Sequence, residues 1–159
     1  DNGRRGPGNA PRGLATQASQ AGMTGVNTAP LSGAEAEGLQ NAILEEMGAV
    51  NTYQEVIATL GSGTVFDRIA RSEQMHVNAL IRVAERHGVS IPENNGETAG
   101  FVYTTLAEAC ALGAQFEQID ADLYTELMAN TENLALTRVY TNLQRASLQN
   151  HLSAFEACK

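Results

Sequence analysis

The chain has 159 residues, enough for one domain with a sizeable core, and 43% of them are hydrophobic while only 5% are aromatic. A formal net charge of −8 argues against nucleic acid and anionic membranes as general partners and is compatible with attracting metal cations. No run of about 18 apolar residues occurs, so the sequence predicts no membrane span.

Residues 1–30 differ in composition from the rest of the chain. They hold six glycines, three prolines, three arginines and one aspartate, which favours an extended N-terminal arm over a packed element. The remaining residues, 31–159, are predicted to form the folded domain and are strongly acidic. A basic arm could therefore lie on a neighbouring copy, giving a homo-oligomer or homopolymer through residues 1–30. The alternative is a solvated leader.

The chain begins at Asp1 without an apolar leader. One interpretation is a mature product whose signal peptide has been removed, and the other is an expressed fragment. We favour the first, and so expect a secreted protein, extracellular or periplasmic.

Two helices are predicted before residue 90. Ser32 with Glu35 three residues later forms a capping-box pattern, and Gly61 ends the apolar stripe that follows. Thr64 and Asp67 can cap the second helix, which stops at Gly88. The inner stripes are Leu39, Ile43, Glu46, Val50, Tyr53, Ile57 and Leu60 in the first helix, and Phe66, Ile69, Glu73, His76, Leu80 and Val83 in the second.

Two more helices follow a polar connection of about 17 residues. Their stripes are Leu106, Cys110, Gly113, Glu117, Asp120, Tyr124 and Leu127 in the third, and Leu136, Tyr140, Leu143, Ser147, His151, either Ala154 or Phe155, and Cys158 in the fourth, which begins near Asn133. Short links within each pair and one long link between the pairs predict an all-α, antiparallel four-helix bundle with one long crossover.

The inner stripes carry charged and titratable side chains where a bundle needs apolar ones. They are Glu46, Glu73, His76, Glu117, Asp120 and His151. Acidic residues are almost never fully buried unless they are paired, and the arginines of the domain fall mostly off the stripes. One or two divalent metal ions would satisfy these carboxylates, and carboxylates with imidazoles suit Fe, Mn or Zn.

These residues resemble a known family. The segments "LSGAEAEGL", "SEQMHVNAL", "GAQFEQIDADL" and "NLQRASLQNHLSAF" are similar to the ferritin-like di-iron carboxylate bundles, the relatives of ferritin and rubrerythrin, and most closely to a poorly characterised branch of ferritin-like domains. The resemblance covers roughly residues 31–157. It implies that Glu46 is a terminal ligand and that Glu73 bridges two Fe or Mn ions. It further implies that His76 completes one site and that Glu117 with His151 forms the other.

The sequence departs from the family pattern in the fourth helix. Leu148 stands where a second Glu-x-x-His motif would place its glutamate, so one bridging ligand is missing. Asp120, one turn after Glu117, is a candidate substitute. Whether the second metal position survives, and whether the protein is an enzyme, stay open at this stage.

Two tyrosines and two cysteines each lie seven residues from a candidate ligand. Tyr53 and Tyr124 each follow a glutamate by seven residues; they fit the core, and their hydroxyls could hydrogen-bond the ligand carboxylates. Cys110 precedes Glu117 by seven residues and Cys158 follows His151 by seven. If Glu117 and His151 meet, antiparallel helices bring the two cysteines to one level, and we expect a disulfide in an oxidising compartment. The alternative is two buried thiols in a cytosolic protein.

Two functions follow from these patterns. The first is a secreted ferritin-like metal-binding protein of oxidase, peroxidase or iron-handling type; no Cys-x-x-Cys pair for a rubredoxin-like module occurs in the chain. The second is a structural subunit of an extracellular filament or tube, in which residues 1–30 bind the next subunit and the metal is structural or vestigial.

Overall fold

The fold, described for residues 29–158 by a computed structural model, consists of helices, and no strand occurs in that range. The elements are α1 (Gly33–Leu60), α2 (Val65–His87), α3 (Leu106–Ala129) and a fourth helix made of α4 (Leu134–Ala146), a π-helical segment η1 (Ser147–His151) and α5 (Leu152–Glu156). The predicted all-α four-helix bundle is confirmed. The predicted arm lies almost entirely outside the described residues.

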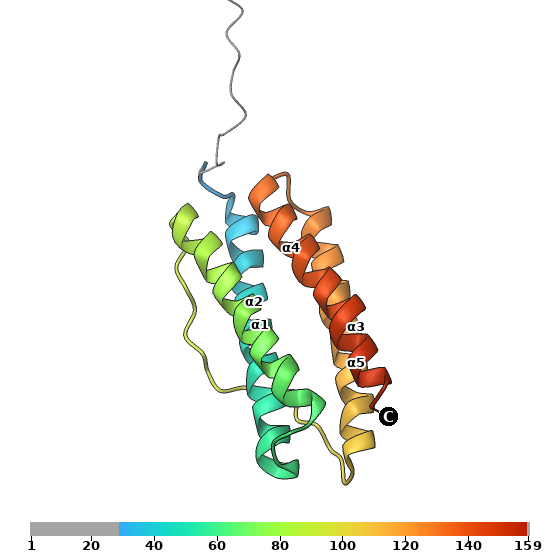
Figure 1. Cartoon of the computed structure of the whole chain (residues 1–159). Coiled ribbons are helices and arrows are strands. Elements are labelled where there is room, and N and C mark those ends of the chain that lie inside the picture. The colour runs from blue at the N-terminus through green and yellow to red at the C-terminus, as the bar shows by residue number, and fades with distance from the viewer. Residues whose placement is uncertain (1–28, 159) are drawn as a thin grey trace, which may run out of the picture.

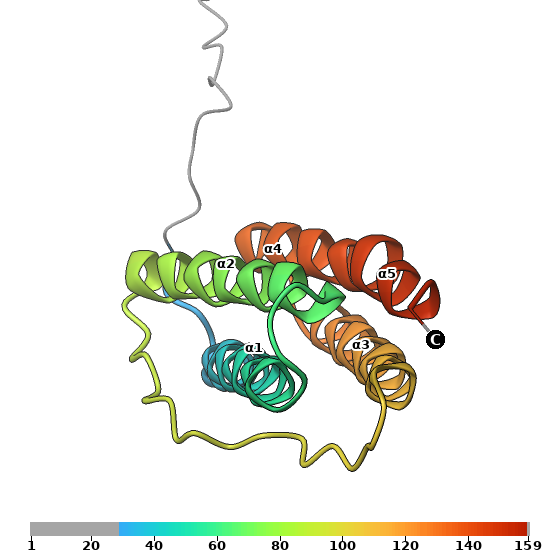
Figure 2. The ribbon, with the colours of Figure 1, turned by 60° about the horizontal axis from the view of Figure 1, so that its bottom comes forward.

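The helices form two antiparallel hairpins that pack side by side (Figure 1). The connection of residues 88–105 runs the length of the bundle along α1, so that α2 and α3 point the same way (Figure 2). Hydrogen bonds hold this connection on α1: the Gln40 side chain donates to the Ser90 carbonyl at 2.9 Å, and the Ala99 amide donates to Thr52 Oγ1 at 2.8 Å. The long link is therefore a crossover, as the sequence predicts.

Local capping signals set the helix boundaries. The predicted capping box of α1 is present, with Ser32 and Glu35 each accepting the other's backbone N–H. The Asp67 carboxylate accepts the Thr64 amide at the start of α2, and Gly88 ends that helix at φ 69°, a left-handed conformation that favours glycine.

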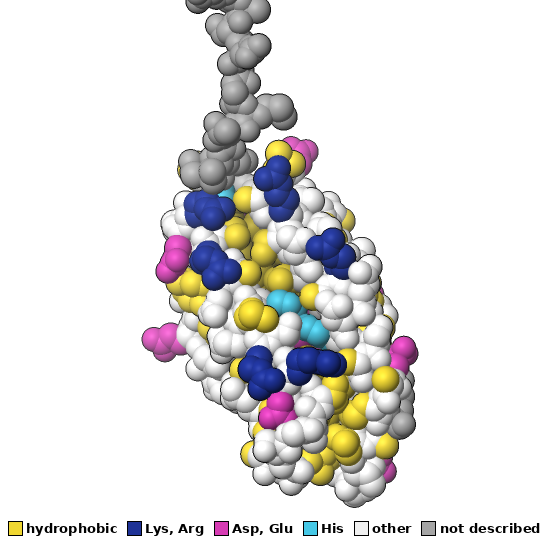
Figure 3. Space-filling view, in the orientation of Figure 1, with side chains coloured by type: hydrophobic (Ala, Val, Ile, Leu, Met, Phe, Trp, Pro, Cys, Tyr) yellow, Lys and Arg dark blue, Asp and Glu magenta, His cyan; other side chains and the backbone are white. Residues whose placement is uncertain are grey.

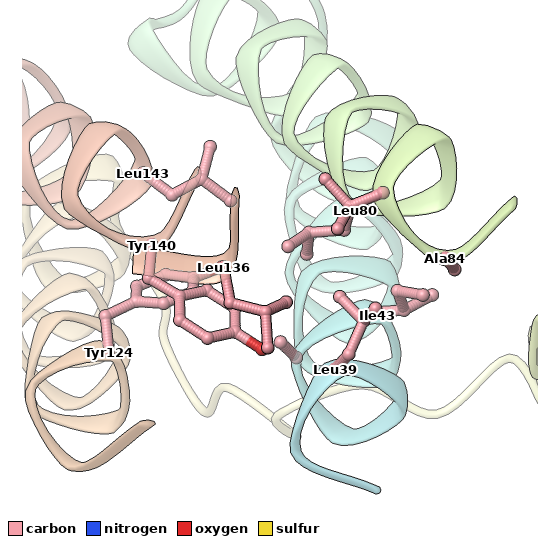
Figure 4. Close-up of a cluster of buried hydrophobic side chains, with 10 residues drawn as sticks. Leu39, Ile43, Leu80, Ala84, Tyr124, Leu136, Tyr140 and Leu143 are labelled. Carbon is pink, nitrogen blue, oxygen red and sulfur yellow. The ribbon is translucent and has the colours of Figure 1, made fainter. Parts of the chain in front are cut away.

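Two apolar clusters fill the ends of the bundle. One joins the start of α1, the end of α2, the end of α3 and the start of α4, as Figure 4 shows. The other, at the opposite end, surrounds the rings of Tyr53, Phe66 and Phe155. Between the clusters lies a layer of buried polar side chains, because each helix carries its charged inner residues in the middle of its stripe.

The second cluster depends on a close approach between α3 and α5. A Cβ atom added at Gly113 would lie 2.9 Å from the Phe155 ring, a distance that real side chains essentially never show. Glycine on the inner stripe therefore lets the last helical segment pack directly against α3.

The π-helical segment is a departure from the predicted continuous fourth helix. Its Leu152 N–H donates to the Ser147 carbonyl, a bond between residues five apart. Leu143, Ser147, His151 and Phe155 are four apart and all buried. In an α-helix each step of four turns the side chain by about 40° beyond one full turn, so three such steps would carry Phe155 off the inner face. The wider turn keeps these residues facing inward.

A disulfide joins Cys110 of α3 to Cys158 after α5, with the two Cα atoms 5.9 Å apart. It ties the C-terminal end of the described chain to the beginning of α3, across 48 positions. No helix within residues 29–158 has the length and hydropathy that a membrane span requires.

Candidate metal centre

The six side chains predicted from the inner stripes meet in the polar layer of the bundle. All are buried, with exposures between 1% and 7%: Glu46, Glu73, His76, Glu117, Asp120 and His151. Each of the four long helices supplies at least one of them. Burial of four carboxylates and two imidazoles at one level is costly for a fold unless each charge finds a partner.

Five of these residues form two groups that could each hold a metal ion. Glu46, Glu73 and His76 make one group, and Glu73, Glu117 and His151 make the other. In each group the ligand atoms all lie within 4.8 Å of one another. The imidazole rings stack with their centroids 5.3 Å apart, so the two groups are immediate neighbours.

Glu73 belongs to both groups. One of its carboxylate oxygens lies 2.7 Å from Nδ1 of His76, and the other lies 2.7 Å from Nδ1 of His151. These contacts are within ion-pair distance, but neither Glu73 oxygen has a hydrogen-bond partner among the described residues. A carboxylate so placed can share its two oxygens between two cations.

Two tyrosines hold the outer carboxylates, which are those of Glu46 and Glu117 on either side of Glu73. Tyr53 of α1 donates to Oε1 of Glu117 on α3 at 2.6 Å, and Tyr124 of α3 donates to Oε1 of Glu46 on α1. The other oxygen of each glutamate faces a histidine, at 3.3 Å for Glu46 with His76 and 3.2 Å for Glu117 with His151. The Glu–Tyr spacing in the sequence thus corresponds to hydrogen bonds that cross between helices.

Asp120 lies in the polar layer but in neither three-residue group. Its Oδ2 accepts a hydrogen bond from Ser147 at 2.7 Å, while its buried Oδ1 has no hydrogen-bond partner among the described residues. Leu148, where the family resemblance would place a glutamate, is only half-buried. The structure therefore places Ser147, rather than Leu148, on the inner side of the π-helical segment, where it contacts Asp120 of α3.

Burial and mutual repulsion shift the pKa values of the acidic side chains in the polar layer. Burial, and then the negative charge of Glu73, raise the pKa of Glu46 to about 7. Burial also raises the pKa of Asp120 well above its usual range, and the negative charge of Glu46 adds to this effect. For Glu73, burial acts in the same direction, but the contacts with His151 and His76 outweigh it and lower its pKa.

The histidines shift in the opposite sense to that expected from burial alone. Burial disfavours the imidazolium forms, but contacts with Glu46 and Glu73 raise the pKa of His76 to about 10. Contacts with Glu117 and Glu73 likewise raise the pKa of His151 to about 9. Protons on these rings can balance the carboxylates, and a cation bound to the same nitrogens would take the place of those protons.

The donor set fits divalent transition-metal ions. Carboxylate and imidazole ligands suit Fe, Mn or Zn, and two groups with one shared glutamate fit a pair of ions. Among residues 29–158, no lysine or arginine is buried to neutralise the layer. The chemistry of these residues thus matches a centre for Fe, Mn or Zn.

The histidine pKa values predict how stability depends on pH in protein stripped of metal by a chelator. Because the folded pKa values, about 9 and about 10, exceed the ordinary 6.5, imidazolium contacts stabilise the fold fully below pH 6.5. That stabilisation is lost as pH rises through 9 and 10. We expect the free energy of unfolding, measured with urea, to fall between pH 7 and pH 10.

Metal-loaded protein is the control for this experiment. Its ring nitrogens would hold cations rather than those protons, so its stability should fall less over the same range. An equal fall in both forms, or a rise in the metal-free form, would contradict the assignment.

Two polar partners of the centre were not identified as functional from the sequence. Ser147 occupies the inner stripe of the fourth helix, and its position among candidate ligands was an available signal. Ser72 places its Oγ 2.9 Å from Nε2 of His151. Its place directly before Glu73 gives no sign of this contact, which depends on how α2 packs against η1.

Comparison with known proteins finds a relative in sequence that also has a similar fold. No protein-family model matches the chain. The chain is 29% identical over 141 residues to the uncharacterised protein MJ0754 of Methanocaldococcus jannaschii, covering 79% of this chain and 75% of that protein. A crystal structure of MJ0754 superposes with a TM-score of 0.69 at 26% identity, over 79% of each chain. The chain is thus similar in sequence and fold to an archaeal protein whose function is not described.

Proposed function

We propose that this protein is a ferritin-like metal-binding protein that holds two Fe or Mn ions in the core of its bundle. The observation that carries the proposal is the pair of buried groups with Glu73 in common, enclosed between two apolar clusters. The order of ligands on the four helices is the one that the family resemblance implies, and the similarity to MJ0754 adds no functional assignment.

Each residue of the centre has a proposed role. Glu46 and His76 would hold one ion, Glu117 and His151 the other, and Glu73 both. Tyr53 and Tyr124 orient the outer carboxylates, because each hydroxyl occupies one oxygen and leaves the second directed at a histidine.

Asp120 is proposed as an additional carboxylate at the pair, in place of the glutamate that Leu148 replaces. Its support is the buried Oδ1, which has no hydrogen-bond partner among the described residues, while Ser147 fixes the other oxygen. The π-helical segment supports the same role, since such segments are frequent at functional sites.

When bound, two such ions would supply redox chemistry of the oxidase, peroxidase or iron-handling kind. The chain's own contribution is to exclude bulk water with the apolar clusters and to keep the carboxylates oriented. Since only two imidazoles and no arginine or lysine share the layer within residues 29–158, its surplus of negative charge favours cations over neutral ligands.

The Cys110–Cys158 disulfide supports a location that oxidises thiols, and we propose a secreted protein on this ground.

The filament or tube subunit stays a prediction, because residues 1–28 of the arm lie outside the described residues. The absence of lysine and arginine from α1 and α3 is compatible with a basic arm binding there.

Metal content tests the proposal directly. Full-length protein purified from its native source without chelator should contain close to two Fe or Mn ions per chain by elemental mass spectrometry. Metal well below one ion per chain, in protein whose circular dichroism is fully helical, would contradict a metal centre in this layer.

A further inference from the structure

A second feature of the centre is a polar pocket that reaches it from outside. The pocket, of about 420 Å³, lies between α2 and the π-helical segment. Its lining residues are Arg68, Ile69, Ser72, Gln149, Asn150 and His151. His151 is also a member of the Glu73–Glu117 group, so one imidazole forms part of both the pocket wall and the candidate metal centre.

The polar groups of the pocket are suited to donating hydrogen bonds to an anion. Arg68 supplies a guanidinium, Gln149 and Asn150 supply amides, and Ser72 supplies a hydroxyl; no acidic residue lines the pocket. Arg68 is exposed and has no carboxylate within ion-pair distance in the part of the chain that the structure describes. Its charge is therefore available to a ligand.

The contact between Ser72 and His151 connects the pocket with the metal side of the ring. Nδ1 of His151 faces Glu73 and Glu117, while Nε2 lies 2.9 Å from Ser72 Oγ. If Nδ1 binds a metal ion, the ring proton stays on Nε2 and is donated to Ser72 Oγ. The hydroxyl hydrogen of Ser72 is then free to be donated into the pocket.

The surface formed by α2 and α4 around the pocket also favours anions. All six arginines of residues 29–158 are on α2 and α4, whereas α1 and α3 contain no basic residue. Figure 3 shows histidine side chains reaching the surface of this face, with Lys and Arg side chains around them. An acidic protein thus presents a locally basic face over α2 and α4, which attracts anions and repels cations.

We propose that this pocket binds a small free oxyanion with the chemistry of inorganic phosphate and places it beside His151, on the Nε2 side of the ring. The link to the metal pair, which passes through the His151 ring, rests on the proposed function, whereas binding within the pocket does not. Metal ions themselves would have to reach the centre by another path, since Arg68 disfavours a cation here.

Titration with inorganic phosphate tests the proposal in full-length protein, both metal-free and loaded with Co(II), whose visible spectrum responds to a change at a ligand such as His151. Calorimetry on metal-free protein should show one phosphate site, and the same titration should change the Co(II) spectrum. Arg68→Met should weaken phosphate binding by about 10-fold or more, the usual effect of losing a charged hydrogen bond. Arg138→Met is the matched control, because Arg138 is exposed on α4 and outside the pocket.

Each outcome decides a separate part of the proposal. Equal weakening of phosphate binding in the two variants would show non-specific attraction and overturn the pocket assignment. Absence of binding at a phosphate concentration of about 10 mM would overturn it as well. Phosphate binding that leaves the Co(II) spectrum unchanged would overturn the link to the metal through His151. Tighter binding of phenyl phosphate than of phosphate would overturn the assignment to a free anion.

The cobalt content of the same samples keeps the two proposals distinguishable. Protein that takes up no Co(II) but binds phosphate through Arg68 would contradict the metal centre and support the anion pocket. Protein that takes up two Co(II) ions but no phosphate would support the metal centre and contradict the anion pocket.

Discussion

Glu73→Gln is expected to weaken metal binding at both positions of the centre by more than about 100-fold. Loss of a group that only orients a ligand already costs about 10- to 100-fold in affinity, and Glu73 contributes an oxygen to each of the two groups. Glutamine keeps the shape of the side chain but removes the charge that faces both histidines. Elemental analysis after equilibrium dialysis against Fe(II) or Mn(II) measures the effect.

Glu45→Gln is the matched control for this variant. Glu45 is the sequence neighbour of Glu46 and loses the same charge, but it lies in neither metal group. It lines a different pocket, against the crossover connection. Metal binding should stay within a few-fold of the unmodified protein. Unchanged stoichiometry and affinity in Glu73→Gln, with the helical spectrum intact, would rule out the shared-ligand assignment.

The second large effect concerns the disulfide. Replacing Cys110 and Cys158 together by alanine should lower the free energy of unfolding by about 4 kcal/mol, the chain-entropy value for a loop of this length. Such a loss is a large share of the roughly 5–15 kcal/mol by which domains are usually stable. Urea unfolding followed by circular dichroism measures it.

A reducing agent separates the covalent link from the effect of the substitutions. Added reductant should move the unfolding midpoint of the unmodified protein towards that of the double variant and should leave the variant unchanged. A midpoint that reductant does not move, in protein shown by mass to be reduced, would mean that the link contributes little to stability.

Most of the fold could be predicted because its signals are local. The capping pair Ser32 and Glu35, the terminating Gly88 and the spacing of the apolar stripes all act within one or two turns of the residues concerned. The length of the link between the second and third helices was enough to predict a crossover, since only an extended chain of that size can return along the bundle.

The burial of the candidate site residues could be predicted for a similar reason. A glutamate at a position whose neighbours one turn away are apolar must be buried, as Glu46 between Ile43 and Val50 shows. What local patterns could not give is which buried carboxylates converge on one point. Asp120 lies in the layer but outside both groups, and this depends on the relative rotation of α3 and η1.

The π-helical segment shows where a regular helical period fails as a guide. The run of four-residue spacings from Leu143 to Phe155 is a visible sign of it, because such a run drifts around an α-helix. The four-residue spacing alone is compatible with a wider helical turn and with side chains that leave the core. The close packing of Phe155 against Gly113 favours the wider turn.

The position of Glu73 has a consequence for how the proposed ions load. A carboxylate held in common makes the two occupancies interdependent, since the first ion to arrive alters the charge and orientation that the second one meets. Protein carrying a single ion is then a distinct chemical species, with its own affinity for the second ion. Under the proposed function, the metal content of this protein would be a population of empty, singly filled and doubly filled chains, whose proportions a bulk average conceals.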